Sequence, residues 1–335
     1  MKNMFPFSAI VGQEEMKRGI ILTAVDPKIG GILVFGDRGT GKSTAVRALA
    51  SLLPRIKVVK DCPYNCASVN NMCPHCSKIS KGRIISVPIP VVDLPLGATE
   101  DRVVGALDLE AALVDGRKTF EPGLLAKANK GYLYIDEVNL LEDHIVDLLL
   151  DVAASGENLV EREGLSVRHE AKFVLVGSGN PEEGELRPQL LDRFGLSIEV
   201  GSPKDINERV EVIKRRDAFE TDPDSFLRKW RRQEKKLQTS IVQAKNCIEN
   251  VKMPDSILED CAKLCLALGA DGLRGELTLL RATRALAAFQ GETLAKRDHL
   301  KMVAPSALRH RLRRDPLDDA GSSVRITRII SEVLP

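Results

Sequence analysis

Eight residues near the start of the chain have the types and the spacing of a phosphate-binding loop. They fit the P-loop pattern G-x-x-x-x-G-K-[ST] and are Gly36, Asp37, Arg38, Gly39, Thr40, Gly41, Lys42 and Ser43. The glycines let backbone N–H groups curl around phosphate oxygens, and a helix N-terminus adds partial positive charge. Lys42 is placed for the β- and γ-phosphates, and the Ser43 hydroxyl for Mg²⁺. The pattern predicts an ATP site; the alternative is a chance match in a Gly-rich turn.

Two adjacent carboxylates, Asp136 and Glu137, follow the apolar run 131–135. This is a Walker B pattern, in which Asp136 holds the Mg²⁺ shell, mainly through water. Glu137 is expected to orient and deprotonate the attacking water. An apolar run that ends in two acids is common by itself, but downstream of a P-loop it indicates nucleotide hydrolysis.

A third polar residue, Asn180, ends the apolar run that begins at Phe173. On a strand beside the nucleotide, the Asn180 amide would project next to the γ-phosphate, at the sensor 1 position, and hold the lytic water. The alternative is an Asn that turns the chain before Pro181.

Taken in order, these motifs resemble those of AAA+ ATPases, many of which form rings. The resemblance implies that Arg193, within residues 190–194 (LLDRF), is an arginine finger that reaches the neighbouring subunit's γ-phosphate. Arg187 is the nearest competitor for that role, and a solvated or salt-bridged arginine is the alternative for both. Arg274 matches the sensor 2 arginine of a helical lid. Residues 10–13 (IVGQ) resemble the element that touches adenine, or are a helix start packed on the core.

Four cysteines that could bind a metal lie close together in the sequence: Cys62, Cys66, Cys73 and Cys76. The last two have the C-x-x-C spacing of half a zinc knuckle, with His75 between them, whereas the first two are more loosely spaced. Four thiolates could close a tetrahedral site for Zn²⁺ or another soft metal. The alternatives are a plain surface insertion and a redox-sensitive pair.

Strands and helices must bring the nucleotide motifs to one edge of a sheet. Apolar runs at 31–35, 131–135 and 173–179 predict buried parallel strands. Residues 84–93 predict a strand and its exit, and their two prolines indicate an edge or an irregular segment. Helices are predicted at 44–53, 109–114 and 140–155, and alternation around a glycine predicts a β-hairpin at 157–169.

The composition of the chain becomes charged and helical after Ser202. We therefore expect an α/β fold, an AAA+ αβα sandwich with a parallel central sheet and β-hairpin insertions, followed by an all-α lid. The expected domains are 1–200, with insertions near 61–77, 97–123 and 157–169, and 201–335. The basic patch 228–236 has one aromatic residue and acidic neighbours, which favours a solvated helix face over nucleic-acid binding.

The totals are those of an ordinary soluble protein. The 335 residues are enough for two domains, with 43% hydrophobic and 29% charged residues. A net charge of +2 gives no argument for affinity to nucleic acid or membranes. We expect no signal peptide and no transmembrane helix. Seven cysteines, an odd number, argue against a disulfide scaffold and favour the reducing cytoplasm.

Longer stretches resemble the I subunit of magnesium chelatases over nearly the whole chain. They are residues 91–97 (VVDLPLG), 100–108 (EDRVVGALD), 120–126 (FEPGLLA), 177–184 (GSGNPEEG), 271–277 (DGLRGEL) and 310–317 (HRLRRDPL). The resemblance assigns no function to the cysteine segment.

This resemblance implies an ATP-dependent ring, formed by copies of the chain together with a D subunit. The ring would drive a porphyrin-binding H subunit to insert Mg²⁺ into protoporphyrin IX, in chlorophyll or bacteriochlorophyll synthesis. The implied cofactors are ATP and Mg²⁺. Two alternatives stay open: a MoxR-like chaperone that loads metal cofactors, and a nucleic-acid motor or transcription activator of the same clade.

Overall fold

The computed structural model describes residues 4–37, 39–68, 73–78, 82–108, 113–114, 119–162, 164–180, 184, 186–270, 273–312 and 322–334. Arg38 of the P-loop and most of the predicted helix 109–114 lie outside these residues.

A sheet of five parallel strands, in the order β11-β1-β10-β7-β4, forms the centre of the fold. Its strands are β1 (Ile32–Gly36), β4 (Val91–Leu94), β7 (Tyr132–Ile135), β10 (Val174–Gly179) and β11 (Leu196–Val200). The predicted parallel sheet is thereby confirmed. The first P-loop glycine, Gly36, ends β1 with φ of +151°, and any Cβ there would collide with the Val200 carbonyl. Glycine is therefore required where the strand turns into the phosphate loop.

The predicted strand 84–93 is two strands in two sheets. β3 (Ile84–Val87) pairs antiparallel with β2 (Ile56–Val59), whereas β4 lies at the edge of the central sheet. Pro88 and Pro90 separate them, because proline has no N–H to give to a strand ladder.

Alternate residues of the strands face two different cores. Ile32 and Val34 of β1 belong to the core that contains α1 (Glu14–Val25) and α2 (Lys42–Leu52), while Leu33 between them belongs to the other. That second core contains α3 (Glu100–Val104), α5 (Leu124–Ala128) and α6 (Asp143–Ser155). Period-two alternation in strands buried on both faces thus produces a three-layer sandwich.

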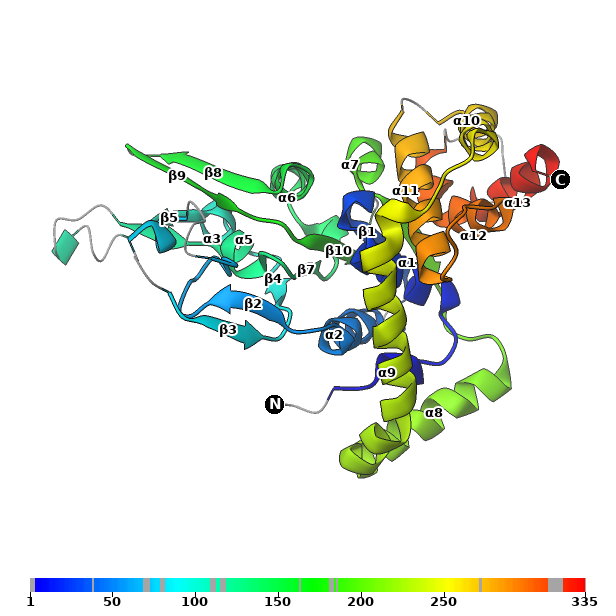
Figure 1. Ribbon diagram of the computed structural model, residues 1–335, viewed down its shortest axis with the longest axis horizontal. Coiled ribbons are helices and arrows are strands. Elements are labelled where there is room, and N and C mark those ends of the chain that lie inside the picture. Colours follow the sequence, from blue (N-terminus) through cyan, green and yellow to red (C-terminus); the bar gives the residue numbers. More distant parts are fainter. Residues whose placement is uncertain are drawn as a thin grey trace.

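Three short antiparallel pairs are inserted into this sandwich: β2–β3, β5–β6 (Gly105–Leu107 and Phe120–Pro122) and β8–β9 (Glu157–Arg162 and Leu165–Glu170). They lie at one end of the molecule, opposite the C-terminal helices (Figure 1). The hairpin predicted at 157–169 is therefore present.

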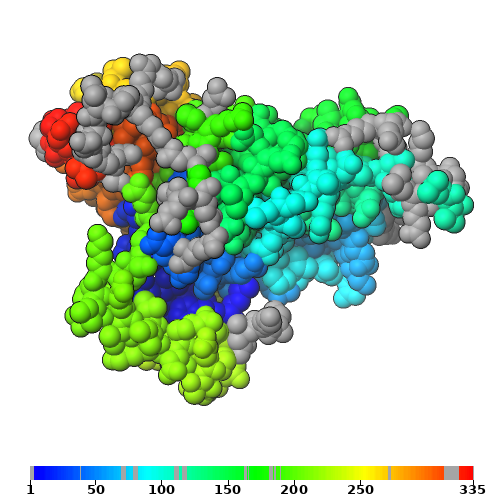
Figure 2. Space-filling model, turned by 180° about the vertical axis from the view of Figure 1, so that it is seen from behind, coloured from blue at the N-terminus to red at the C-terminus, as the bar shows by residue number. Residues whose placement is uncertain are grey.

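The chain beyond β11 is helical in its described residues, apart from an isolated bridge between Lys252 and Leu294. Its α-helices are α8 (Ile206–Thr221), α9 (Pro223–Cys247), α10 (Asp255–Leu268), α11 (Arg274–Phe289), α12 (Arg297–Leu308) and α13 (Ser322–Val333). Seen from behind, α8 and the first part of α9 protrude from the molecule (Figure 2), whereas Ile241 and Ala244, later in α9, belong to the same core as α1 and α11. Residues of α10–α13 share the core of α1 and β11, so this bundle packs on the sandwich. None of the described helices is long and apolar enough to cross a membrane.

Candidate functional site

The P-loop lies between β1 and α2, as its sequence predicts. Gly39 and Gly41 have φ of +78° and +83°, a conformation that glycine adopts without strain, and α2 begins at Lys42. The Lys42 ammonium bends back over the loop, with Nζ 2.5 Å from the Gly36 carbonyl oxygen and 3.2 Å from that of Asp37. The loop is therefore curled around the ammonium group that the sequence assigns to phosphate.

The carboxylate of Asp136 is held by two hydroxyl groups. Ser178 Oγ donates to Asp136 Oδ1 at 2.5 Å, and the Tyr134 hydroxyl lies 3.2 Å from the same oxygen and 3.0 Å from Ser178 Oγ. Burial raises the pKa of Tyr134 to about 12, so this phenol stays protonated and acts as a donor. Since the Asp136 residue is exposed, the arrangement suits a carboxylate that holds hydrated Mg²⁺.

Glu137 has φ of +55° and ψ of +54°, the left-handed conformation that side chains other than glycine rarely adopt. Its N–H lies 3.4 Å from Ser178 Oγ, so one serine contacts both Walker B residues. Backbone strain of this kind is often found where a side chain must be aimed at a reacting group. Asn180, at the end of β10, is 8% exposed.

These residues surround one cavity of about 1050 Å³. It is lined by residues 39–43 of the P-loop and Thr44 after it, by residues 10, 11 and 13 of the IVGQ element, and by residues at the strand ends. The residues at the strand ends are Tyr134, Asp136, Glu137, Ser178 and Asn180. The structure thus brings together Lys42, Ser43 and the predicted Walker B and sensor 1 residues. A cavity of this size is large enough for a nucleotide.

Helix α8 forms another wall of the cavity, through Arg209, Val212, Ile213, Arg215 and Arg216. Arg215 also lies over the ring of Trp230, 4.7 Å from its centroid. The sequence marked this segment only as charged and helical, because nothing in its periodicity shows which element it faces. Ser178 was likewise missed, although a serine within an apolar strand next to the Walker B strand could have drawn attention.

Arg193, predicted as the arginine finger, and Arg274, predicted as the sensor 2 residue, lie outside the lining of the cavity. Arg193, at the end of α7 (Pro188–Arg193), forms ion pairs at 2.5 Å with Asp147 and 2.7 Å with Asp151, both on α6. Arg274 pairs with Asp192 at 2.9 Å. Neither arginine is among the residues that line the cavity. Within one chain, Asp192 of α7 therefore joins Arg274, the first residue of α11, to the helix that ends at Arg193.

Arg187, the competitor for the finger role, pairs with Asp143 at 2.5 Å. Asp143, Asp147 and Asp151 are spaced four residues apart on α6 and so share one face of that helix. The four cysteines come together in the loop between β2 and β3, away from the cavity, with all four sulfurs within 4.8 Å of one another.

A parallel sheet in this strand order, with a P-loop, paired carboxylates and an amide around one cavity, defines a P-loop ATPase of the AAA+ class. A family model of the AAA lid domain matches residues 258–330, and one of magnesium chelatase subunit ChlI matches residues 107–189. A putative ATPase from Cytophaga hutchinsonii has the same fold, with a TM-score of 0.67 at 16% identity, over 97% of this chain and 91% of that one.

Relatives of known name match the full chain. The magnesium-chelatase 38 kDa subunit of Cereibacter sphaeroides is 67% identical to this chain, and the match covers both chains completely. The corresponding subunit of Rhodobacter capsulatus is 65% identical, and the match covers 99% of this chain and 95% of the relative. A chain in a model of the complex between subunits BchI and BchD of magnesium chelatase is 62% identical, with complete coverage of both chains and a TM-score of 0.58. The chain belongs to the magnesium chelatase subunit I family.

Proposed function

We propose that this chain is the ATP-hydrolysing motor subunit of a magnesium chelatase, which inserts Mg²⁺ into protoporphyrin IX together with D and H subunits. A ring of copies of this chain, joined to the D subunit, would act on a porphyrin-binding H subunit. Because the proposed substrate is ATP, we expect the protein to act in the cytoplasm. Because Mg²⁺ gives up its water ligands reluctantly, coupling its insertion to ATP hydrolysis is physically reasonable.

The observation that carries this proposal is the shared cavity. P-loop, Walker B and sensor 1 residues, which lie far apart in the sequence, all line it, in a chain 67% identical to a magnesium-chelatase subunit over its full length. The full-length match favours this family over the MoxR-like chaperones.

In the proposed reaction, residues 36–43 bind the ATP phosphates through backbone N–H groups and Lys42. Ser43 and Asp136 would hold the Mg²⁺ of MgATP, which neutralises charge on the phosphates. Glu137 accepts a proton from the attacking water, and the Asn180 amide orients that water. Ser178 keeps the Asp136 carboxylate in place through its 2.5 Å hydrogen bond.

Completion of the site requires a second subunit. Arg193 would leave its two α6 carboxylates and stabilise the γ-phosphate of the neighbouring subunit in the transition state. Arg274 is joined through Asp192 to the same α7 surface, and we propose that it reports the nucleotide state across this contact.

We propose that residues 1–200 are the nucleotide-binding domain and 201–335 the lid. The last strand of the sheet ends at Val200, and the following segment returns to the cavity through Ser202, Pro203 and α8. Closure of α8 on bound nucleotide would give the helical half a means to sense hydrolysis.

The test is Mg²⁺ insertion into a protoporphyrin, followed by fluorescence, with purified D and H subunits and ATP. Chelation should require this chain and should be lost in Lys42→Ala, because the P-loop lysine is removed. Lys263→Ala is the matched control, since Lys263 lies on the surface of α10 with its side chain 58% exposed. If the chain hydrolyses ATP but never supports chelation with cognate partners, the proposal is wrong.

A further inference from the structure

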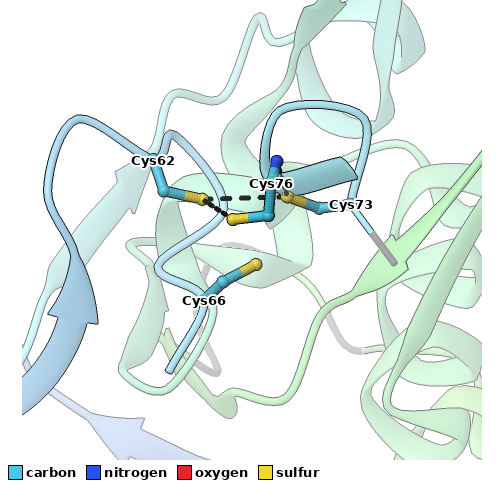
Figure 3. Close-up of side chains that lie close together, drawn as sticks. All are labelled: Cys62, Cys66, Cys73 and Cys76. Atoms are coloured by element: carbon cyan, nitrogen blue, oxygen red, sulfur yellow. Dashed lines mark hydrogen bonds between the residues drawn. The ribbon is translucent and has the colours of Figure 1, made fainter. Parts of the chain in front are cut away.

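The four cysteines of the β2–β3 loop form a buried cluster apart from the nucleotide cavity. Cys62, Cys66, Cys73 and Cys76 are 7%, 2%, 3% and 1% exposed. None is in a disulfide. Figure 3 shows the four side chains converging on a common centre, with Cys66 directed at the other three. The sequence left open whether the cysteines are a metal site, an insertion or a redox pair.

The distances between the sulfurs are those of a tetrahedral thiolate site. Cys62 Sγ lies 3.8 Å from Cys73 Sγ and 3.6 Å from Cys76 Sγ. With Zn–S bonds of about 2.3 Å, the sulfurs around one tetrahedral Zn²⁺ lie about 3.8 Å apart. A disulfide needs sulfurs at about 2.05 Å. The observed spacing therefore suits four ligands around one ion.

The backbone also supports metal ligation. The Cys76 N–H donates to Cys73 Sγ at 3.1 Å. A hydrogen bond from the N–H of the second cysteine of a C-x-x-C turn to the sulfur of the first stabilises the thiolate form that binds a metal. This contact lies within the pair whose spacing predicts half a zinc knuckle.

Among the described residues, the apolar core of the loop is small. Apart from the cysteines, its buried cluster contains Val59, Tyr64 and Ala126, with Phe120 partly buried against it. So small an apolar core gives little folding free energy, and small domains of this kind commonly depend on a structural metal.

We propose that Cys62, Cys66, Cys73 and Cys76 bind one structural Zn²⁺ ion. Thiolates select soft cations, and four of them with no open position make a structural rather than a catalytic site. Sulfurs all within 4.8 Å of one another surround a single ion rather than an iron–sulfur cluster, whose ligands are spread over several irons. Four thiols bind the ion as thiolates by releasing their protons to solvent, so no oxidation or reduction takes place.

The ion would fix the loop to two elements of the ATPase domain. Asn65, between two of the ligands, donates to the Lys127 carbonyl at the end of α5, at 3.0 Å. The Tyr64 carbonyl accepts from Asn129 Nδ2 at 2.7 Å, and the Tyr64 ring lies 4.8 Å from that of His169 on β9. Zn²⁺ would therefore fix the positions of the β8–β9 hairpin and of the end of α5 relative to the loop.

The experiment measures metal in the purified full-length chain after gel filtration in reducing buffer without chelator. Mass spectrometry should find about one zinc per chain. Growth with Co²⁺ should give the visible absorption of tetrahedral thiolate cobalt. Cys76→Ala should lose the metal, Cys76→His should keep it because imidazole is also a zinc ligand, and the exposed Cys247→Ala should be unchanged.

A second measurement uses the unaltered chain, because Cys76→Ala could fail to fold. Adding a chelator should release zinc, expose these four thiols to alkylation, and speed hydrogen exchange in 124–130 and 165–170 but not in α2. Reduced chain that neither contains nor takes up Zn²⁺ or Co²⁺ overturns the proposal, as do bound iron in place of zinc and disulfides among the four cysteines. None of these outcomes bears on ATP hydrolysis, whose residues lie elsewhere.

Discussion

The guanidinium of Arg193 lies 2.5 Å from a carboxylate oxygen of Asp147 on the same chain. Asp151, one helical turn further along α6, holds the same Nη1 atom at 2.7 Å. The Arg193 side chain is still 32% exposed, so it is paired without being buried. An arginine in this state keeps its charge at the protein surface and can exchange its partners for a phosphate at modest cost, because exposed ion pairs contribute little stability.

Arg193→Ala should bind ATP but hydrolyse it on the order of 10³-fold more slowly, the usual effect of losing an arginine finger. Mixing Arg193→Ala subunits with Lys42→Ala subunits should restore hydrolysis, since intact fingers of the second reach intact P-loops of the first. The measurement is steady-state ATPase rate against mixing ratio. Arg187→Ala is the matched control, because Arg187 pairs with the same helix, at Asp143. Normal hydrolysis by Arg193→Ala alone would remove the finger assignment.

A second prediction concerns Arg274, which pairs with Asp192 and does not line the cavity. Arg274→Ala should leave MgATP binding by the isolated chain unchanged and lower ATPase only in the assembled ring. Titration of a fluorescent ATP analogue into dilute chain measures the first effect, and ATPase at assembling concentrations measures the second. Weakened binding to the isolated chain would show instead that Arg274 acts on its own subunit's nucleotide.

The nucleotide site could be predicted from the sequence because short-range patterns fix it. The P-loop must follow a strand, and the parallel pairing of Val176 with Tyr134 carries Ser178 to the level of Asp136. The strand ends therefore meet at one edge of the sheet, as the positions of Asp136 and Asn180 implied.

The position of the helical half could not be predicted in the same way. Arg309 donates to the Ser197 carbonyl, and Arg311 to those of Phe194 and Gly195, so buried arginines distant in the sequence fix the bundle against β11. No periodicity in α12 or in the turn Arg309–Arg311 that follows it encodes these contacts. The sequence consequently identified Arg274 as a lid residue without showing that Asp192 is its partner.

Ser178 provides a third prediction, because it donates to Asp136 and accepts from the Tyr134 hydroxyl. Ser178→Ala should raise the Mg²⁺ concentration for half-maximal ATPase on the order of 10- to 100-fold, as loss of a ligand's supporting hydrogen bond does. Tyr134→Phe should have a smaller effect, since Ser178 still holds Asp136. An unchanged Mg²⁺ requirement in Ser178→Ala would mean that Asp136 needs no such support.

The last prediction follows from His310, which is partly buried at the junction of bundle and sandwich, with Nε2 2.9 Å from the Phe194 carbonyl oxygen. Burial, and then the charge of Arg311, hold the pKa of His310 well below its ordinary 6.5. The folded chain thus keeps this imidazole neutral, whereas the unfolded chain protonates it below pH 6.5. The neutral His310 therefore contributes stability above pH 6.5, and this contribution is lost as the pH falls below 6.5, by up to about 1.4 kcal/mol per pH unit for one proton.

Urea unfolding of His310→Gln between pH 7 and 5.5 should therefore show a shallower loss of stability than the unaltered chain, because glutamine can donate to the same carbonyl but does not titrate. Equal slopes for the two proteins would show that other groups, such as His169 and His299, whose pKa values burial also lowers, account for the acid sensitivity.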